Sequence, residues 1–144
     1  MRLTLHTDYA LRTLMYLAVH TDRLSSIREI ATAYGISENH LMKIIHRLAL
    51  GGFIETIRGR GGGMRLARPA SAIRIGDVVR HTEEDMALVG CLQSGGAKDT
   101  APCLLADACR LRGALGEALG SFMTVLDGYT LADVVTSHER QRLA

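Results

Sequence analysis

Apolar residues recur at helical spacing through the first fifty positions of the chain. A helix is predicted over residues 6–20, and a second is predicted to begin at Ser26, where Ser26 and Glu29 form an S-x-x-E capping box. Gly35 ends the second helix, and Ser37 can cap a third with the same i, i+3, i+4, i+7 pattern. Two helices joined by so short a turn predict a helix-turn-helix.

A strand pattern follows the third helix. Apolar positions in 53–57 and 64–66 flank the run Arg-Gly-Arg-Gly-Gly-Gly at 58–63. Glycines tolerate the positive φ angles of a hairpin tip, so the two flanks are predicted to pair as a β-hairpin. A short helix is expected over residues 73–81. A helix-turn-helix followed by a two-stranded ribbon predicts a winged helix, mainly α with a small β-hairpin.

The second half of the chain has a different pattern. Periodicity is lost over residues 86–102, and residues 93–100 are typical of a loop. One long helix is predicted from about Leu104 to near Asp127. Its apolar residues cover more than one face, which suits burial between two subunits. A last short helix is expected at 129–135, and the tail beyond it is expected to be frayed.

Composition and charge add a partner to this picture. The 144 residues suffice for one small domain with an oligomerisation arm. No long apolar run or signal peptide is recognised, so no membrane association and a cytoplasmic location are expected. Residues 1–76 carry 11 Lys/Arg against 5 Asp/Glu, whereas residues 77–144 carry 6 against 10. This division predicts a polyanionic partner for the first half, although a merely uneven surface would produce the same counts.

DNA is the polyanion that a winged helix suits. A recognition helix enters the major groove with its N-terminal turns leading, so the residues off its apolar stripe face the bases. Asn39 can pair with adenine, and Lys43 can reach guanine or a phosphate. Arginines on a Gly-rich hairpin suit a narrow minor groove or phosphate contacts. The predicted DNA-contacting residues are Ser37, Asn39, His40, Lys43, Arg47, Arg58, Arg60 and Arg65.

The chain has three cysteines, Cys91, Cys103 and Cys109, which cannot all pair as disulfides within one chain. They lack the C-x2–4-C pairs of zinc fingers, and a set of thiolates one ligand short is typical of an iron–sulfur site. Buried structural thiols are the alternative, which their Gly, Ser, Asp and Lys neighbours disfavour. His81 and Asp8 are candidates for a fourth ligand, although the sequence alone favours an ordinary surface histidine and a helix N-terminal charge.

Five segments carry a resemblance to a known family: residues 3–12, 39–45, 57–66, 73–80 and 129–135. Together they resemble the NsrR family of nitric-oxide-sensing repressors, winged-helix iron–sulfur regulators whose relatives include IscR. This resemblance implies a homodimer crossed through the long helix, with one [4Fe-4S] cluster per subunit. It implies that the cluster ligands are Cys91, Cys103, Cys109 and, from the other subunit, Asp8.

Two positions favour the NsrR branch, and one feature departs from it. IscR-like proteins have a histidine where Arg112 stands, and they lack an acid at the position of Asp8. The departure is the spacing of eleven residues between Cys91 and Cys103, which is longer than family members usually have. Because doubling a flexible loop costs only about 0.6 kcal/mol of closure entropy, Cys91 can still be a ligand.

The predicted organisation has three parts. Residues 1–80 form a winged helix-turn-helix DNA-binding domain with its wing at about 53–68, residues 81–106 a cluster-binding loop, and residues 107–144 the dimerisation helix and C-terminal helix. The predicted function is a homodimeric repressor of nitrosative-stress genes that binds a palindromic double-stranded DNA operator and senses nitric oxide through a [4Fe-4S] cluster. The alternative is a related regulator that senses redox or iron–sulfur status through a [2Fe-2S] cluster or free thiols. No nucleophile–base pair or phosphate-binding loop is recognised, so the chain is not expected to be an enzyme.

Overall fold

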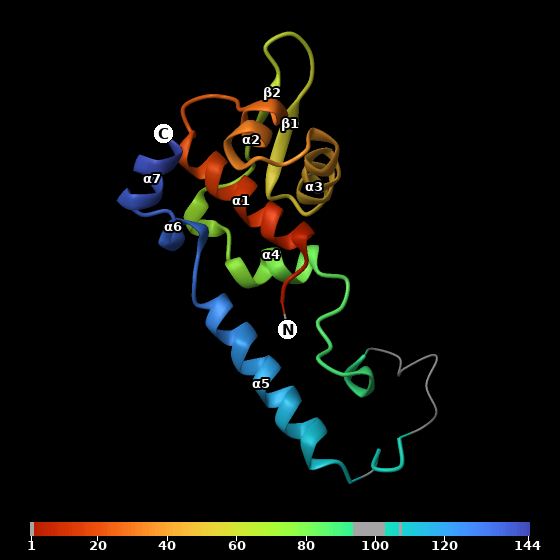
Figure 1. Ribbon diagram of the computed structural model, residues 1–144. Coiled ribbons are helices and arrows are strands. Elements are labelled where there is room, and N and C mark those ends of the chain that lie inside the picture. Colours follow the sequence, from red (N-terminus) through yellow and green to blue (C-terminus); the bar gives the residue numbers. More distant parts are fainter. Residues whose placement is uncertain (1, 94–102, 107) are drawn as a thin grey trace.

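The computed structural model describes residues 2–93, 103–106 and 108–144 of the chain (Figure 1). The described part is mainly helical with one antiparallel hairpin, as the sequence predicted. Its elements are α1 (Leu5–Val19), α2 (Ile27–Tyr34), α3 (Glu38–Leu50), β1 (Ile54–Ile57), β2 (Gly63–Leu66), η1 (Ala70–Ala72), α4 (Ile75–Thr82), η2 (Gly90–Leu92), α5 (Arg110–Asp127), α6 (Leu131–Val134) and α7 (Ser137–Leu143). In Figure 1, α5 projects from a body formed by the other α-helices and the hairpin.

Local capping sets the boundaries of the helix-turn-helix. The Ser26 hydroxyl accepts a hydrogen bond from the Glu29 N–H at 3.2 Å, and the Glu29 carboxylate accepts one from the Ser26 N–H at 2.6 Å. Gly35 ends α2 in the left-handed conformation, with φ of 65°. The Ser37 hydroxyl then accepts the His40 N–H at the start of α3. The predicted capping box and both caps around the turn are therefore confirmed.

The wing is the β1–β2 hairpin that follows α3. Ile54 pairs with Leu66 at the base of the hairpin. Gly59 and Gly61 adopt φ angles of 102° and 76° at its tip, a conformation that favours glycine. Ser25 forms an isolated bridge with Met64 in β2, which attaches the hairpin to the segment before α2.

One apolar core holds the body together. Its largest fully buried apolar side chains come from α1, α2, α3, α4 and α6 and the segment before α4, and each contributes about 1.5–3 kcal/mol by leaving water. They are Leu14, Leu17, Ile30, Leu41, Ile44, Leu48, Ile73, Val78, Val79 and Leu131. By contrast α5, which is described along its whole length, buries none of its side chains. The core therefore belongs to the body alone.

A close junction fixes the C-terminal end of α5 on the body. Arg80 of α4 donates to both carboxylate oxygens of Asp127, at 2.8 and 2.5 Å. A Cβ placed on Gly76 would lie 1.9 Å from an Asp127 carboxylate oxygen, so any larger residue there would displace the Asp127 side chain. The Ile75 N–H also donates to the Tyr129 carbonyl at 2.9 Å. The long helix is thus held at one end, beside α4.

The long helix begins later than its sequence pattern predicts. The structure starts α5 at Arg110 rather than at Leu104, and turns at residues 103–106 precede it. Leu104 is fully exposed, so no buried contact favours a helical turn there. Cys109 is the N-cap instead, with an extended backbone. Most of the loop predicted at 93–100 lies outside the described residues.

Three further predictions need correction, all of them about where helices begin and end. The helix predicted over 73–81 begins at Ile75, and the last predicted helix shortens to α6. The tail expected to be frayed instead forms α7, because Thr136 and Glu139 complete a capping box. His20 adds a long-range contact, since its Nε2 lies 2.8 Å from the Leu143 carbonyl oxygen. The T-x-x-E signal was present in the sequence and was missed.

Candidate functional site

The exposed side of α3 carries the polar residues predicted to face DNA. Asn39, His40 and Lys43 are exposed, while the opposite face of the helix is buried in the core. Ser37 is also exposed, but its hydroxyl is occupied as the N-cap of α3. Burial therefore gives α3 one orientation, with its N-terminal polar residues available to a groove of DNA.

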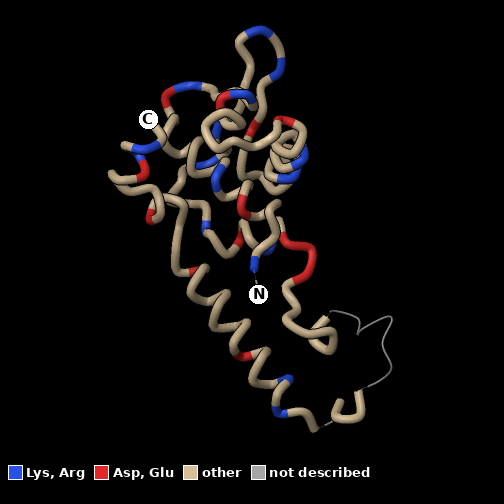
Figure 2. Tube along the Cα trace, in the orientation of Figure 1, with Lys and Arg blue, Asp and Glu red and all other residues tan. Residues whose placement is uncertain are grey.

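The wing adds positive charge beside α3. Arg58 and Arg60 are exposed around the glycine-rich tip of the hairpin. Arg65 is also exposed, but it forms an ion pair with Glu55, which lies directly opposite it across the strands. Figure 2 shows Lys and Arg gathered at the hairpin tip and along α3. Two neighbouring elements thus present one basic surface.

Arg47 is the predicted DNA residue that the structure places differently. Its Nε donates to the His81 carbonyl at 2.9 Å, and its own carbonyl oxygen lies 2.6 Å from the Nε2 of His81. Arg47 therefore faces α4, near the C-terminal end of α3. His81, a fourth-ligand candidate from the sequence, has its Nε2 in this same contact. Sequence spacing could not detect a pairing across 34 positions.

The three cysteines are free thiols at the ends of the described segments. Cys91 lies in η2 and is exposed, Cys103 is exposed, and Cys109 is partly buried as the N-cap of α5. The Cys109 Sγ accepts a hydrogen bond from the Arg112 N–H at 3.3 Å. Within residues 2–93, 103–106 and 108–144, no three His, Cys, Asp or Glu side chains lie together as a metal-binding group.

Asp8 lies in the first turn of α1 and not in a group with the cysteines. Its carboxylate forms an ion pair with Arg12 at 3.0 Å, and its side chain is 41% exposed. Thiolates and a carboxylate are suitable iron ligands, so the donor types fit an iron–sulfur cluster. One chain as described does not gather all four ligands.

The segment that leads to Cys91 is tied to α1. The hydroxyls of Thr7 and Thr82 lie 2.8 Å apart in a buried hydrogen bond, and the Thr4 N–H donates to the Glu83 carboxylate at 2.8 Å. Burial would raise the pKa of Glu83, but hydrogen bonds from Thr7 and Thr4 hold it below its usual value. These threonines were not singled out from the sequence, since only the folded chain brings them to α4.

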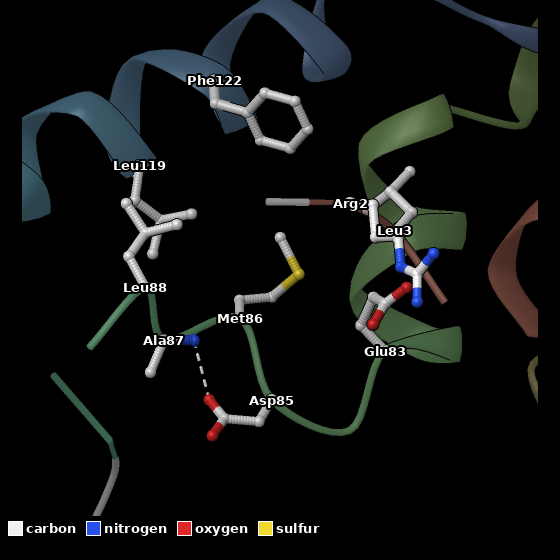
Figure 3. A pocket seen from close by; sticks show the side chains of 9 residues that line it. All are labelled: Arg2, Leu3, Glu83, Asp85, Met86, Ala87, Leu88, Leu119 and Phe122. Carbon is white, nitrogen blue, oxygen red and sulfur yellow. Dashed lines mark hydrogen bonds between the residues drawn. The ribbon is translucent and has the colours of Figure 1, made fainter. Parts of the chain in front are cut away.

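A cavity separates the middle of α5 from the body. It has a volume of about 460 Å³ and is lined by Arg2, Leu3, Glu83, Asp85, Met86, Ala87, Leu88, Leu119 and Phe122. Figure 3 shows the Met86 side chain extending into this space toward the ring of Phe122. The lining is mostly apolar, so the chain leaves apolar surface uncovered here.

No helix in the described segments is long and apolar enough to cross a membrane.

Comparison with known proteins places these features in a family. The family model Rrf2, described as an iron-dependent transcriptional regulator, matches residues 3–137. The HTH-type transcriptional regulator NsrR of Geobacillus kaustophilus is 51% identical over 136 residues, covering 94% of this chain and 90% of that protein. The NsrR of Halalkalibacterium halodurans is 47% identical over 140 residues, covering 96% and 93%.

Solved structures show the same fold. A structure of T. potens IscR aligns with a TM-score of 0.75 and 27% identity, covering all of this chain and 93% of that one. The resemblance to NsrR predicted from the sequence is confirmed, and the matched relatives are transcriptional regulators rather than enzymes. Since the family model spans nearly the whole chain, this protein belongs to the Rrf2 family of transcriptional regulators.

Proposed function

We propose that the chain is one subunit of a homodimeric repressor that binds a palindromic DNA operator and senses nitric oxide through a [4Fe-4S] cluster. We place it in the cytoplasm, with nitrosative-stress genes as its targets. The observation that carries the proposal is the combination, in one Rrf2 chain, of an exposed basic winged helix and three free cysteines. The basic winged helix suits DNA binding, and the three cysteines suit an iron–sulfur cluster.

DNA binding follows from the orientation of α3 and the wing. Asn39 and Lys43 project from the exposed face of α3 and can contact base edges in a major groove. Arg58 and Arg60 on the wing can contact phosphates or the adjacent minor groove. Two such units related by a two-fold axis read two half-sites, so a dimer requires a palindromic operator.

Dimerisation follows from the exposure of α5. Leu111 and Val125 are 66% and 60% exposed on a helix that buries none of its side chains. Because such an apolar surface is unfavourable in water, we assign it to the interface with a second copy. The cavity between α5 and the body lies along the same helix.

Cys91, Cys103 and Cys109 would hold the cluster, with Asp8 of the second copy as the fourth ligand. Asp8 is half-exposed on α1, so its carboxylate can leave Arg12 and bind an iron of the cluster held by the other subunit. A carboxylate binds iron less tightly than a thiolate, and an iron so held is the one that nitric oxide can reach. Since Asp8 and the recognition helix belong to the same body, its ligation would connect the sensor to the DNA-binding surface.

The direct test is native mass spectrometry of protein purified without oxygen, combined with selection from a random duplex pool. We expect a dimer with two four-iron clusters that selects a palindromic duplex and releases it after nitric oxide is added. Two-iron clusters would support the redox alternative. A metal-free dimer after reconstitution would overturn the iron–sulfur proposal and favour a thiol-based regulator.

Substitutions assign the ligands. Cys103→Ala should abolish the cluster and the iron-dependent part of DNA binding, and Asp8→Ala should alter the cluster absorption spectrum. Asp22→Ala is the matched control, because Asp22 is an exposed carboxylate beyond the other end of α1. A normal cluster and normal DNA release in Asp8→Ala would remove Asp8 from the ligand set.

A further inference from the structure

We propose that His81 is a positioning residue that couples the thiol-bearing segment to the recognition helix α3 by holding the C-terminal end of α3 on α4. This inference rests on the proposed function and deepens it. It concerns how a change at the thiols reaches the DNA-binding surface, and it starts from a histidine that neither DNA contact nor metal ligation explains.

His81 and Arg47 contact each other through two opposed hydrogen bonds. The His81 Nε2 lies 2.6 Å from the Arg47 carbonyl oxygen, and since a carbonyl only accepts, Nε2 carries the hydrogen. The Arg47 Nε donates in return to the His81 carbonyl at 2.9 Å. The Arg47 carbonyl also accepts the N–H of Gly51, the C-cap of α3, at 3.1 Å, so His81 is a second donor to it, whereas the His81 carbonyl lies in the last turn of α4. The pair therefore joins the C-terminal end of α3 to that of α4 through two hydrogen bonds.

The imidazole is also packed tightly between α3 and the wing. Its ring centroid lies 5.5 Å from that of Phe53. The guanidinium carbon of Arg68 lies over the same Phe53 ring, 4.9 Å from its centroid. A Cβ on Gly51 would come within 2.7 Å of the His81 Nε2. His81 therefore contacts both the C-cap of α3 and Phe53, the residue directly before β1 of the wing, so its position affects both DNA-contacting elements.

The segment that follows α4 leads to Cys91. Thr82 and Glu83, directly after His81, are the residues bound to α1. Asp85 accepts hydrogen bonds from the Ala87 N–H at 2.7 Å and from the Gln93 side chain at 2.9 Å, which closes the segment containing Cys91. Figure 1 shows this segment continuing from the end of α4 to η2. Along the chain, the Cys91 segment is therefore connected to α4 through the residues next to His81.

The experiment compares His81→Leu and His81→Gln with the wild-type dimer. Leu removes the donor but fills much of the volume, whereas Gln places an amide N–H near the position of Nε2. His138→Leu is the matched control, because His138 is exposed on α7. For each protein we would measure the Kd for the duplex that wild type selects, with and without iron, together with iron content and thermal unfolding.

We expect His81→Leu to retain its iron. The ratio of its iron-free Kd to its iron-loaded Kd should be at least tenfold smaller than that of the wild type. His81→Gln should restore most of this ratio, and His138→Leu should leave it unchanged. A merely structural role would weaken both states by the same factor and preserve the ratio. Equal weakening, or an unchanged ratio in His81→Leu, would overturn the inference.

Arg47→Met provides the second variant if His81→Leu does not fold. It removes the hydrogen bond to the His81 carbonyl from the side of α3 and should reduce the same ratio. If Arg47 instead contacts a phosphate, Arg47→Met would weaken both states equally and lower the salt dependence by about one counterion. That result would contradict the coupling role.

Measurements on the wild-type protein distinguish a failure of the proposed function from a failure of the inference about His81. If wild type binds the selected duplex equally with and without iron, the proposed function fails and the coupling role fails with it. If wild type responds to iron and His81→Leu responds equally, only the inference about His81 fails.

Discussion

The winged-helix body and the long helix α5 differ in how completely they bury their apolar side chains. The body buries leucines and isoleucines such as Leu14 and Leu41 completely, whereas α5 leaves Leu111 and Val125 largely exposed. The body therefore has its own apolar core, whereas α5 has no fully buried side chain. We expect a second copy of the chain to cover the exposed apolar residues of α5.

The chemistry is divided in the same way. Exposed basic residues lie on α3 and the wing, while the free thiols lie at η2 and at the start of α5. The basic surface is complete in one subunit, but no three metal-ligand side chains gather among the described residues of that subunit. Under the proposed function, recognition of DNA would depend on the fold of the subunit, whereas sensing would depend on assembly.

The core of the body should give the largest effect. Leu14→Ala should lower the free energy of unfolding by about 2–5 kcal/mol, because it leaves a cavity in a fully buried site. Leu111→Ala on α5 is the matched comparison, and its effect should depend on protein concentration. Denaturant unfolding at several concentrations measures both. A change of less than about 0.5 kcal/mol for Leu14→Ala, which is typical of surface positions, would contradict this difference between the body and α5.

The second prediction concerns what covers α5. Leu111→Glu should raise the dissociation constant of the dimer about 100-fold, or by about 2.8 kcal/mol, because it places a charge in an apolar interface. Leu50→Glu is the control, since Leu50 is 68% exposed at the end of α3 and Leu111 is 66% exposed. Sedimentation velocity measures the association. Equal behaviour of the two variants would show that α5 is no interface.

The third prediction tests whether the arginines of the wing contact DNA. Replacing Arg58 and Arg60 with Ala should reduce the slope of log affinity against log salt by about two, because two phosphate contacts are lost. The control replaces Arg140 and Arg142, which are exposed on α7. Fluorescence anisotropy over a salt series measures the slopes. An unchanged slope for the wing variant would remove the wing from the DNA interface.

The smallest effect is expected at the cap of α2. The hydrogen bond from the Ser26 N–H holds the pKa of Glu29 below its ordinary value of 4.5. Glu29 therefore stabilises the fold above that value, and the stabilisation is lost as the pH falls through the lowered pKa. Glu29→Gln should cost about 0.3–1 kcal/mol at neutral pH and nothing once the carboxyl is protonated. Unfolding measured from pH 7 to pH 3 checks this, and a constant difference would contradict it.

Sequence alone was sufficient where near neighbours decide the structure. The capping box of Ser26 and Glu29, the turn at Gly35 and the glycine-rich hairpin tip each depend on residues a few positions apart. Apolar periodicity identified the buried face of α3, and with it the exposed polar face. Segments throughout the chain identified the resemblance to NsrR, which the identity with NsrR proteins confirms.

Only the tertiary structure decided the contacts between distant positions. It brought Arg47 against His81, placed α7 against His20, and placed Asp127 against Gly76 and Arg80. It also moved the start of α5 to Arg110, because apolar periodicity continues where no core is present to stabilise a helix. Periodicity records which faces a helix can bury, but packing against distant residues determines which of them are buried and which side chains remain free to act.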